Sequence, residues 1–405
     1  MLLGAFGDPG HAFPMIALGR ALRARGHDVT LQTWRHWKAH VEAEGLLFAP
    51  APEYPVFPQG PEPLDLYEAV VQATTDTGPL VRELRPEVVV ADILTLAPAL
   101  AAEQASLPWA TLIPHVYPPG EPDFPIYSLG ARLPRTAAGR ALWRHAQGPT
   151  RTGLERGRSE LNRARSRLGL GALDRPHGGI SRRLALVGTF PQLEYPRTWP
   201  AHVHVVGPLM WEPPARDVEL PTVAFAGARA GGDGAPGGSG EAPLVLIAPS
   251  TAQDAEHRLL RGALEGLADA PVRVLATWNR RPPPRPLPVP ENARVVEWVS
   301  YSRTMPACDV VVCHAGHGTL VRALASGCAV VAAPAAGDMN ENAARLDWAG
   351  AGVRIPRRFA SPRPLRLAVD RALGVPSIRA RARELARWSD AHDGAATAAA
   401  LIERL

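Results

Sequence analysis

The sequence predicts an α/β protein with two doubly wound parallel sheets, and three observations lead to this prediction. Short apolar runs typical of buried strands alternate with amphipathic helical patterns along the chain, an order that favours parallel sheets with helices on both faces. The 405 residues suffice for two such domains, each with its own core. A glycine-rich interval at 227–240, preceded by Pro213 and Pro214, separates two runs of this alternation.

The elements of each half follow in order. The first half has an apolar strand at 1–6, a helix at 14–25, and further strands at 28–32, 88–91 and 109–113. The second half has strands at 244–248, 272–276, 293–296, 310–313 and 329–333. We therefore expect an N-terminal domain over 1–212, a linker over 213–243 and a C-terminal domain over 244–385.

Composition and charge exclude several classes of protein. The 44 basic and 39 acidic residues give a net charge of +5, without the dense basic blocks of a nucleic-acid binder. The sequence has no run of about eighteen apolar residues that would predict a membrane span, and the N-terminus lacks the pattern of a secretory leader. Cys308, Cys313 and Cys328 lack the paired spacing of a zinc site or a disulfide framework. We expect a cytoplasmic protein with reduced core thiols.

The segment 309–345 carries the strongest functional signal. A buried strand at 310–312 runs into a turn with Gly316 and Gly318, and a helix follows from Thr319. The first N–H groups of a helix lack intrahelical partners and lie at the positive end of its dipole, so this turn is suited to an anion such as a diphosphate. The same arrangement also occurs in βα units that bind nothing.

The continuation of this segment resembles a known family. After His314 come Gly316, Gly318 and Thr319, then Ala323-Leu324, Gly327, Pro334, Asp338, Asn342 and Arg345. This spacing resembles the donor-binding signature of nucleotide-sugar-dependent glycosyltransferases with the GT-B fold, in particular the bacterial natural-product enzymes of glycosyltransferase family one. The resemblance implies two Rossmann-like domains facing across a cleft, with the acceptor on the first and the nucleotide sugar on the second. It also implies that a C-terminal helix at about 386–405 packs back on the first domain.

His11 is our candidate for the catalytic base. It lies in a second glycine turn at a strand end, and a neutral histidine has a pKa suited to removing the proton of an acceptor hydroxyl. It matches the Gly-His-x-x-Pro motif of the resembling family. Asp92 ends a strand and could hold the ring of His11, although it could also be a simple helix cap. Asp8 is the second choice as base.

The donor site should include the phosphate turn and residues near it. Ser250 and Thr251 could donate to the diphosphate, and His314 could offset the charge of the leaving group. Trp298 stands where the family has an aromatic residue beside the nucleobase, although it could also be an ordinary core tryptophan. The predicted donor-binding residues are Ser250, Thr251, Trp298, Val299, His314, Gly316, His317, Gly318, Thr319, Asp338 and Met339.

Three positions depart from the family pattern. Arg322 replaces the usual glutamate that accepts from both ribose hydroxyls, and arginine cannot accept. Met339 replaces a glutamine that contacts the sugar. These two changes favour a dTDP-linked deoxysugar over a UDP-sugar. Ala315 replaces a glycine, and we expect this small residue to be harmless.

The resulting prediction is an inverting glycosyltransferase that needs neither metal nor cofactor and acts on a natural-product aglycone. An aromatic set in the first-domain loops should bind the acceptor: Trp34, Trp37, Tyr54, Phe57, Tyr67, His115 and Tyr117. A homodimer is compatible with the sequence. Alternatives are a nucleotide-sugar epimerase on the same scaffold, a lipid-linked transferase, and a degenerate homologue that only binds nucleotide, which Arg322 and Met339 would explain.

Overall fold

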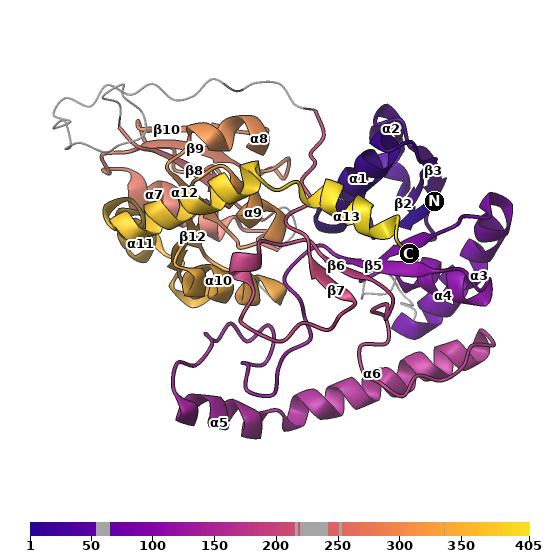
Figure 1. Cartoon of the computed structure of the whole chain (residues 1–405). Coiled ribbons are helices and arrows are strands. Elements are labelled where there is room, and N and C mark those ends of the chain that lie inside the picture. The colour runs from indigo at the N-terminus through magenta and orange to yellow at the C-terminus, as the bar shows by residue number, and fades with distance from the viewer. Residues whose placement is uncertain (54–64, 215–217, 219–241, 251–252, 336) are drawn as a thin grey trace. The chain divides into compact units, whose positions relative to one another are not determined.

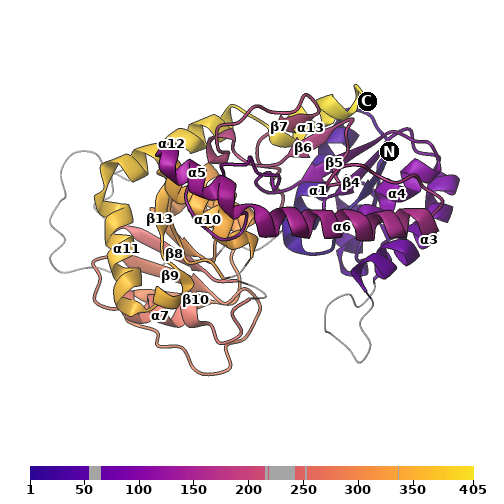
Figure 2. The same cartoon turned by 90° about the horizontal axis from the view of Figure 1, so that it is seen from below.

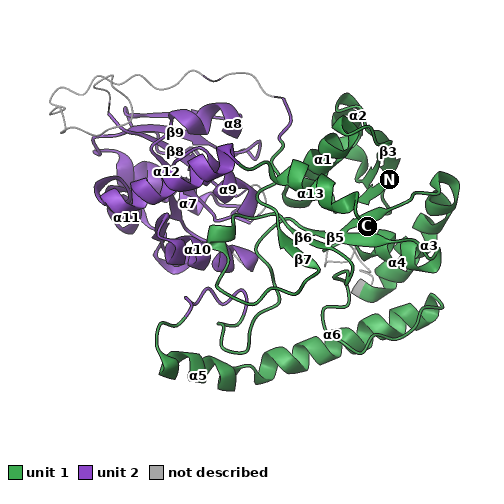
Figure 3. Cartoon of the chain, viewed as in Figure 1, with its two compact units in different colours: residues 1–126, 134–211, 392–405 green, residues 127–133, 212–391 purple. Residues whose placement is uncertain are grey.

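The structure is a computed structural model of the whole chain, and it describes residues 1–53, 65–214, 218, 242–250, 253–335 and 337–405 (Figure 1). The chain forms two compact units. Unit 1 comprises 1–126, 134–211 and 392–405, and unit 2 comprises 127–133 and 212–391 (Figure 3). Most of the expected linker, 213–243, lies outside the described residues.

Unit 1 is built on a seven-stranded parallel sheet in the order β3-β2-β1-β4-β5-β6-β7. Its strands are β1 (Leu2–Gly4), β2 (Thr30–Thr33), β3 (Leu47–Pro50), β4 (Val89–Asp92), β5 (Trp109–Ile113), β6 (Ala185–Val187) and β7 (Val203–Val205). Its helices are α1 (Pro9–Ala24), α2 (Lys38–Ala43), α3 (Leu66–Leu84), α4 (Leu96–Gln104), α5 (Ala137–Ala146), α6 (Gly148–Arg167) and α13 (Gly394–Ile402). The long helix α6 contacts α3 (Figure 2).

Both faces of this sheet are buried, because successive side chains of a strand point to opposite sides. In β1, Leu3 belongs to the core shared with α1, α2 and α13, whereas Leu2 belongs to a separate core with α3 and α4. Neither side chain is exposed to solvent. The continuous apolar strands of the sequence therefore reflect a sheet with helices on both sides.

Unit 2 has a six-stranded parallel sheet in the order β10-β9-β8-β11-β12-β13. Its strands are β8 (Leu244–Ala248), β9 (Arg273–Thr277), β10 (Ala293–Val296), β11 (Val310–Cys313), β12 (Ala329–Ala332) and β13 (Gly352–Arg354). Its helices are α7 (Arg258–Leu267), α8 (Tyr301–Thr304), α9 (His317–Ala325), α10 (Asp338–Ala349), α11 (Pro362–Gly374) and α12 (Pro376–Asp390). One face packs Val245 and Ile247 of β8 against α7 and α11. The predicted α/β fold with two parallel sheets is confirmed.

The first helix differs from the prediction. It was expected from residue 14, but α1 begins at Pro9. Proline is favoured in the first turn because its fixed φ suits a helix and its missing N–H would have had no partner there. Pro14 lies inside α1 and removes only the bond that its N–H would have made to Gly10. Consequently His11 lies on the first helical turn and not in a loop. The strands β3, β6, β7 and β13 were not predicted.

The division of the chain also differs from the expected boundaries in two places. Residues 127–133 belong to unit 2, because Arg354 donates to the carbonyl of Gly130 and Arg132 forms an ion pair with Asp347. Of the expected segment at about 386–405, only 392–405 joins unit 1, because α12 ends at Asp390 and α13 then packs on α1. No helix among the described residues is long and apolar enough to span a membrane.

The three cysteines are free and buried, as predicted. Burial raises the pKa of the Cys308 and Cys313 thiols to about 12. Both thiols are therefore protonated at neutral pH and inert as nucleophiles.

The docking of α13 in unit 1 yields a stability prediction. A Cβ added at Gly394 would lie 2.6 Å from the carbonyl oxygen of Gly207 and 2.7 Å from that of Pro208. We expect Gly394→Ala to destabilise the protein by about 1–3 kcal/mol, the usual cost of overpacking. Thermal unfolding measures this change.

Gly374→Ala is the matched control, because a Cβ at this last residue of α11 meets nothing within 4 Å. Equal melting temperatures for the two variants would contradict the close docking of α13.

Candidate functional site

In unit 1 the strand order reverses at β1, and β4 is its neighbour on the other side. The carboxyl ends of these two strands carry a histidine and a carboxylate. His11 Nδ1 lies 2.8 Å from Asp92 Oδ1. Ligands of doubly wound sheets bind in the crevice at such a reversal. The structure therefore brings together two residues that are 81 positions apart in the chain.

The environment of the pair suits a base. Asp92 is 1 % exposed, and its Oδ2 accepts a hydrogen bond of 3.3 Å from the backbone N–H of Phe6. With Asp92 as a carboxylate, Nδ1 of His11 carries the ring proton and donates it, so that Nε2 is the basic nitrogen. The ring of Phe6 meets that of His11 edge-on at 6.1 Å. Asp92 thus fixes both the orientation and the tautomer of His11.

Two of the predicted acceptor-binding residues lie close to this pair. The ring of His115, which follows β5, is 6.2 Å from the ring of His11. Trp34, which follows β2, packs against Phe6 at 4.9 Å. The indole of Trp34 also covers Gly7, where an added Cβ would lie 2.0 Å from its ring. Glycine at this position lets the indole lie directly on the backbone between β1 and α1.

The other predicted acceptor-binding residues do not join this group. Trp37 is in the core, where its indole N–H donates to Gly7 O at 2.7 Å. Tyr117 is also buried, in a cluster with Arg197 and Trp199. Tyr67 contacts α6, where its hydroxyl donates to Gly157 O. Tyr54 and Phe57 lie outside the described residues. Trp37 and Tyr117 pack inward instead of facing solvent, and their contact with an acceptor stays a prediction.

Asp8, the second candidate base, is exposed and is the N-cap residue of α1. Its side chain makes no capping hydrogen bond. It therefore lacks the fixed geometry of the His11–Asp92 pair.

In unit 2 the strand order reverses at β8, whose neighbour on the other side is β11. The carboxyl ends of these strands carry the predicted donor residues. Ser250 follows β8, is 3 % exposed and accepts from the N–H of Gln253 at 2.9 Å. His314 follows β11, and its Nδ1 lies 3.4 Å from Ala248 O. Thr251 lies outside the described residues.

The helix start predicted as an anion site is present. Helix α9 begins at His317, and Leu320 is the first residue whose N–H bonds back within the turn, to Gly316 O at 3.0 Å. The amides of Gly318 and Thr319 precede that bond and point out of the helix end. Gly318 is exposed, and an added Cβ there would meet nothing within 4 Å. A diphosphate can approach this end closely.

The turn before α9 is strained, contrary to the expectation that Ala315 is harmless. Ala315 is fully buried with φ of 61°, a left-handed conformation that costs residues with a Cβ about 1–2 kcal/mol. The side-chain amide of Asn342 on α10 holds this turn by donating to Ala315 O at 3.1 Å. At Gly316 an added Cβ would lie 2.4 Å from His314 Nε2. The spacing of His314, Gly316 and Asn342 in the motif is therefore explained by their packing.

Trp298, which was predicted to flank the nucleobase of the donor, is in contact with the side chain of an arginine. The guanidinium of Arg280 lies 4.5 Å from the centre of the indole, and Tyr301 stacks on the indole at 6.2 Å. Asn279 and Arg280 are consecutive residues with positive φ at the end of β9. Neither Asn279 nor Arg280 was among the residues predicted from the sequence for the donor site. The clustered polar residues after an apolar strand were the available signal.

The remaining predicted donor residues fall into two groups. Asp338 and Met339 are partly exposed in the first turn of α10, at the carboxyl end of β12. Val299 is fully buried, and His317 is 9 % exposed. The buried side chain of Val299 contributes packing, and its assignment as a donor contact stays a prediction.

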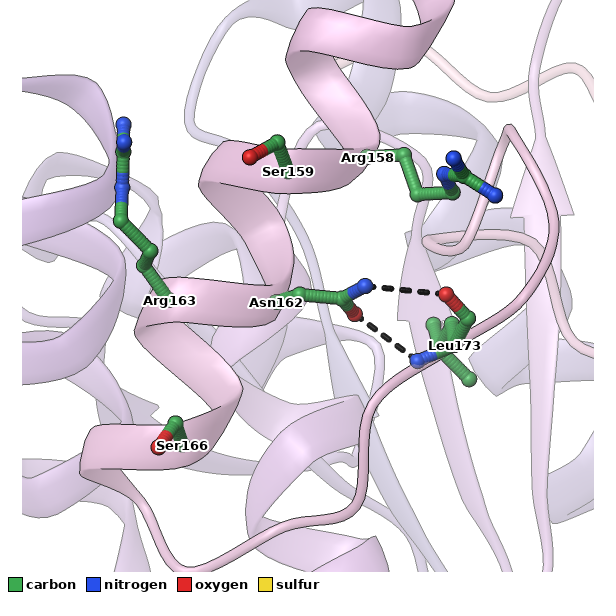
Figure 4. A pocket seen from close by; sticks show the side chains of 6 residues that line it. All are labelled: Arg158, Ser159, Asn162, Arg163, Ser166 and Leu173. Atoms are coloured by element: carbon green, nitrogen blue, oxygen red, sulfur yellow. Dashed lines mark hydrogen bonds between the residues drawn. The ribbon is translucent and has the colours of Figure 1, made fainter.

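A hollow elsewhere in unit 1 has a structural explanation. It lies between α6 and the loop after it and is lined by Arg158, Ser159, Asn162, Arg163, Ser166 and Leu173 (Figure 4). Asn162 Nδ2 donates to Leu173 O at 2.9 Å, and Leu173 N–H donates to Asn162 Oδ1 at 2.8 Å. The paired bonds fasten the loop to the helix.

Comparison with known proteins finds a family model that matches part of the chain and relatives that match nearly all of it. Residues 262–400 match the family described as erythromycin biosynthesis protein CIII-like, C-terminal domain. The chain is 29 % identical to 4'-demethylrebeccamycin synthase of Lentzea aerocolonigenes, over 98 % of this chain and 97 % of the relative. It is 28 % identical to O-mycaminosyltylonolide 6-deoxyallosyltransferase of Streptomyces fradiae, over 98 % and 95 %.

Solved structures agree in fold. The glycosyltransferase of kitacinnamycin superposes with a TM-score of 0.77 at 22 % identity, covering 100 % of this chain and 98 % of the other. A glycosyltransferase of Streptomyces sp. SF2575, complexed with thymidine diphosphate, gives 0.66 at 22 % identity, covering 100 % and 99 %. With its two parallel-sheet domains and these relatives, the chain is a glycosyltransferase of the GT-B fold, similar to enzymes of antibiotic and natural-product biosynthesis.

Proposed function

We propose that this glycosyltransferase inverts the anomeric centre and uses His11 as the base that deprotonates the acceptor. The observation that carries the proposal is the 2.8 Å contact between His11 Nδ1 and Asp92 Oδ1 at the strand reversal of unit 1. Nε2 of His11 takes the proton of the acceptor hydroxyl while its oxygen attacks the anomeric carbon from the face opposite the nucleotide. Asp92 stabilises the imidazolium that forms.

The donor half of the proposal rests on unit 2. The start of α9 would bind the diphosphate, with Ser250 and His314 beside it at the ends of β8 and β11. Charge that develops on the leaving diphosphate is stabilised by these amides and by the histidine, so the proposed reaction is independent of metal. The proposed acceptor is a natural-product aglycone, and His115 and Trp34 are its proposed contacts.

For the donor we propose a dTDP-linked deoxysugar. Arg322 cannot accept a hydrogen bond from a 2′-hydroxyl, and Met339 offers the sugar an apolar contact. Two relatives support this choice, because one is named a 6-deoxyallosyltransferase and a structural neighbour is complexed with thymidine diphosphate. The ordered His11–Asp92 pair supports turnover over a purely nucleotide-binding role, for which such a pair would be unnecessary.

Replacing His11 tests the base. We expect His11→Ala to reduce turnover by about 10²–10⁴-fold, the usual contribution of a general base. Binding of dTDP should be unchanged, because the proposed nucleotide contacts are all in unit 2. Turnover is measured by product chromatography and binding by calorimetry.

The control for this variant is His27→Ala, which removes a histidine paired with Glu403 at the amino-terminal edge of the sheet. Undiminished turnover of His11→Ala would contradict the proposal, and a loss in Asp8→Asn would then identify Asp8 as the base.

A comparison of nucleotides tests the donor. We expect dUDP to bind about tenfold or more tightly than UDP, because a hydroxyl left without an acceptor in a closed site costs about 1–3 kcal/mol. These two ligands differ only at the 2′ position, so the nucleobase does not contribute to the difference in affinity. Equal affinities in a calorimetric titration would exclude the preference for deoxyribose.

The protonation of His314 gives a prediction about pH. Burial lowers the pKa of His314, so its ring is neutral at pH 7 without ligand. An anion near the ring favours the imidazolium and raises this pKa. Affinity for dTDP should therefore increase as pH falls from about 8 towards 6, with proton uptake on binding. Calorimetry in two buffers of different ionisation enthalpy measures the uptake.

A His314→Gln variant, which can donate but does not titrate in this range, should show no proton uptake. Equal uptake in the variant and the parent protein would assign the proton to another group.

A further inference from the structure

The departure at Arg322 is accompanied by a carboxylate from a distant part of the chain. Glu212, the first residue of the longer segment of unit 2 (212–391), lies with its Oε2 3.9 Å from Nε of Arg322. Its other oxygen, Oε1, accepts hydrogen bonds from the hydroxyls of Ser300 and Ser302 and from the N–H of Ser302 at 3.1 Å. Glu212 therefore has one oxygen saturated by three donors and one that faces the guanidinium.

This group lies between the two ends of the proposed nucleotide site. Ser300 and Ser302 follow two and four residues after Trp298, the residue proposed to flank the base. Arg322 is in the last turn of α9, whose first turn is proposed to bind the diphosphate. Helix α8, which contains Ser302, packs on α9. Because the ribose joins the base to the diphosphate, this is the part of unit 2 where the ribose belongs.

The Arg322–Glu212 pair is incomplete as a salt bridge. A distance of 3.9 Å between Nε and Oε2 exceeds that of a hydrogen bond. The two side chains are only 15 % and 14 % exposed, and burial lowers the pKa of Arg322 despite the nearby carboxylate. Within the described part of the chain, the guanidinium makes no hydrogen bond. Two opposite charges are thus mostly out of water, with donor and acceptor capacity left over.

We propose that Arg322 and Glu212 together bind the 3′-hydroxyl of the donor's 2′-deoxyribose, an inference that rests on the proposed nucleotide-sugar function. A hydroxyl oxygen placed between them can lie about 2.8 Å from both atoms, accepting from Arg322 and donating to Glu212 Oε2. This completes the hydrogen bonding of both charged groups. It makes Glu212 a specificity-determining residue and moves the carboxylate that reads the ribose from α9 to the start of the segment 212–391.

The same geometry explains the discrimination against ribose. A 2′-hydroxyl beside the bridged 3′-hydroxyl would need an acceptor of its own. Glu212 Oε1 already receives three hydrogen bonds, and Arg322 has no acceptor. A ribonucleotide would therefore leave a donor unpaired in a mostly closed site.

The test measures the dissociation constants of dTDP and of 2′,3′-dideoxythymidine diphosphate by calorimetry. For the unmodified protein we expect dTDP to bind about tenfold or more tightly, because its 3′-hydroxyl bonds to two charged groups. Equal binding of the two ligands overturns the proposal. This comparison needs no variant and so does not depend on how a substitution folds.

Two variants then assign the residues. In Glu212→Gln the amide replaces the acceptor that faces Arg322, and the ratio of the two dissociation constants should fall to about one. Arg322→Gln should lower the same ratio and also reduce the preference for dUDP over UDP, because glutamine can accept from a 2′-hydroxyl. Each ratio is measured within one protein, so a partly unfolded fraction cancels.

Glu384→Gln on α12 and Arg366→Gln on α11 are the matched controls, since they alter exposed ion pairs. They should keep the ratios of the unmodified protein. If Glu212→Gln keeps them as well, Glu212 only fastens the start of the segment 212–391 to α8, and the proposal is overturned. If none of the nucleotides binds to the unmodified protein, the proposed function fails, and this inference fails with it.

Discussion

In each sheet the first strand is where the strand order reverses, and this arrangement determines where side chains can meet. After β1 the chain forms α1 on one face, whereas after β4 it forms α4 on the other. The segments that leave two adjacent strand ends therefore diverge, and an opening is left between them. His11 and Asp92 occupy this opening in unit 1, and His314 and Ser250 occupy its counterpart in unit 2. The helix starts, glycines and charged residues discussed above contribute to the proposed sites because they lie at these two sheet edges.

The two edges are ordered by different means. In unit 1 a buried carboxylate fixes a histidine, and the cost of burying Asp92 is offset by its bonds to His11 and to the N–H of Phe6. In unit 2 a strained turn carries the amides proposed to bind the diphosphate, and Asn342 holds that turn from the next helix. A strained backbone persists only where its surroundings hold it in place. The proposed donor site therefore depends on α10 packing correctly, whereas the proposed base depends on one hydrogen bond between the first turn of α1 and the end of β4.

Much of this was predictable from the sequence, for identifiable reasons. Strands rich in valine and the glycine turns specify parallel sheets, and carboxyl ends of neighbouring strands must share an edge, so the pairing of His11 with Asp92 could be inferred. Whether an aromatic residue points inward depends on the packing of the whole unit, so the burial of Trp37 and Tyr117 could not be predicted from the sequence. Glu212 belongs to no motif and lies 88 residues before Ser300, so only the folded chain brings it to Arg322. The strain at Ala315 was equally hidden, because the residue type alone does not reveal its φ.

The exchange of a glutamate for Arg322 would by itself place an uncompensated cation among mostly buried groups, which is costly. Glu212 offsets that charge without closing the pair into a direct hydrogen bond. A closed pair would have no capacity left for a ligand, whereas an open pair retains one donor and one acceptor for a single hydroxyl. Specificity of this kind comes less from added attraction than from the absence of a partner for the second hydroxyl of the wrong ligand. The altered position on α9 and the carboxylate of Glu212 therefore form one proposed functional unit, and neither can be interpreted alone.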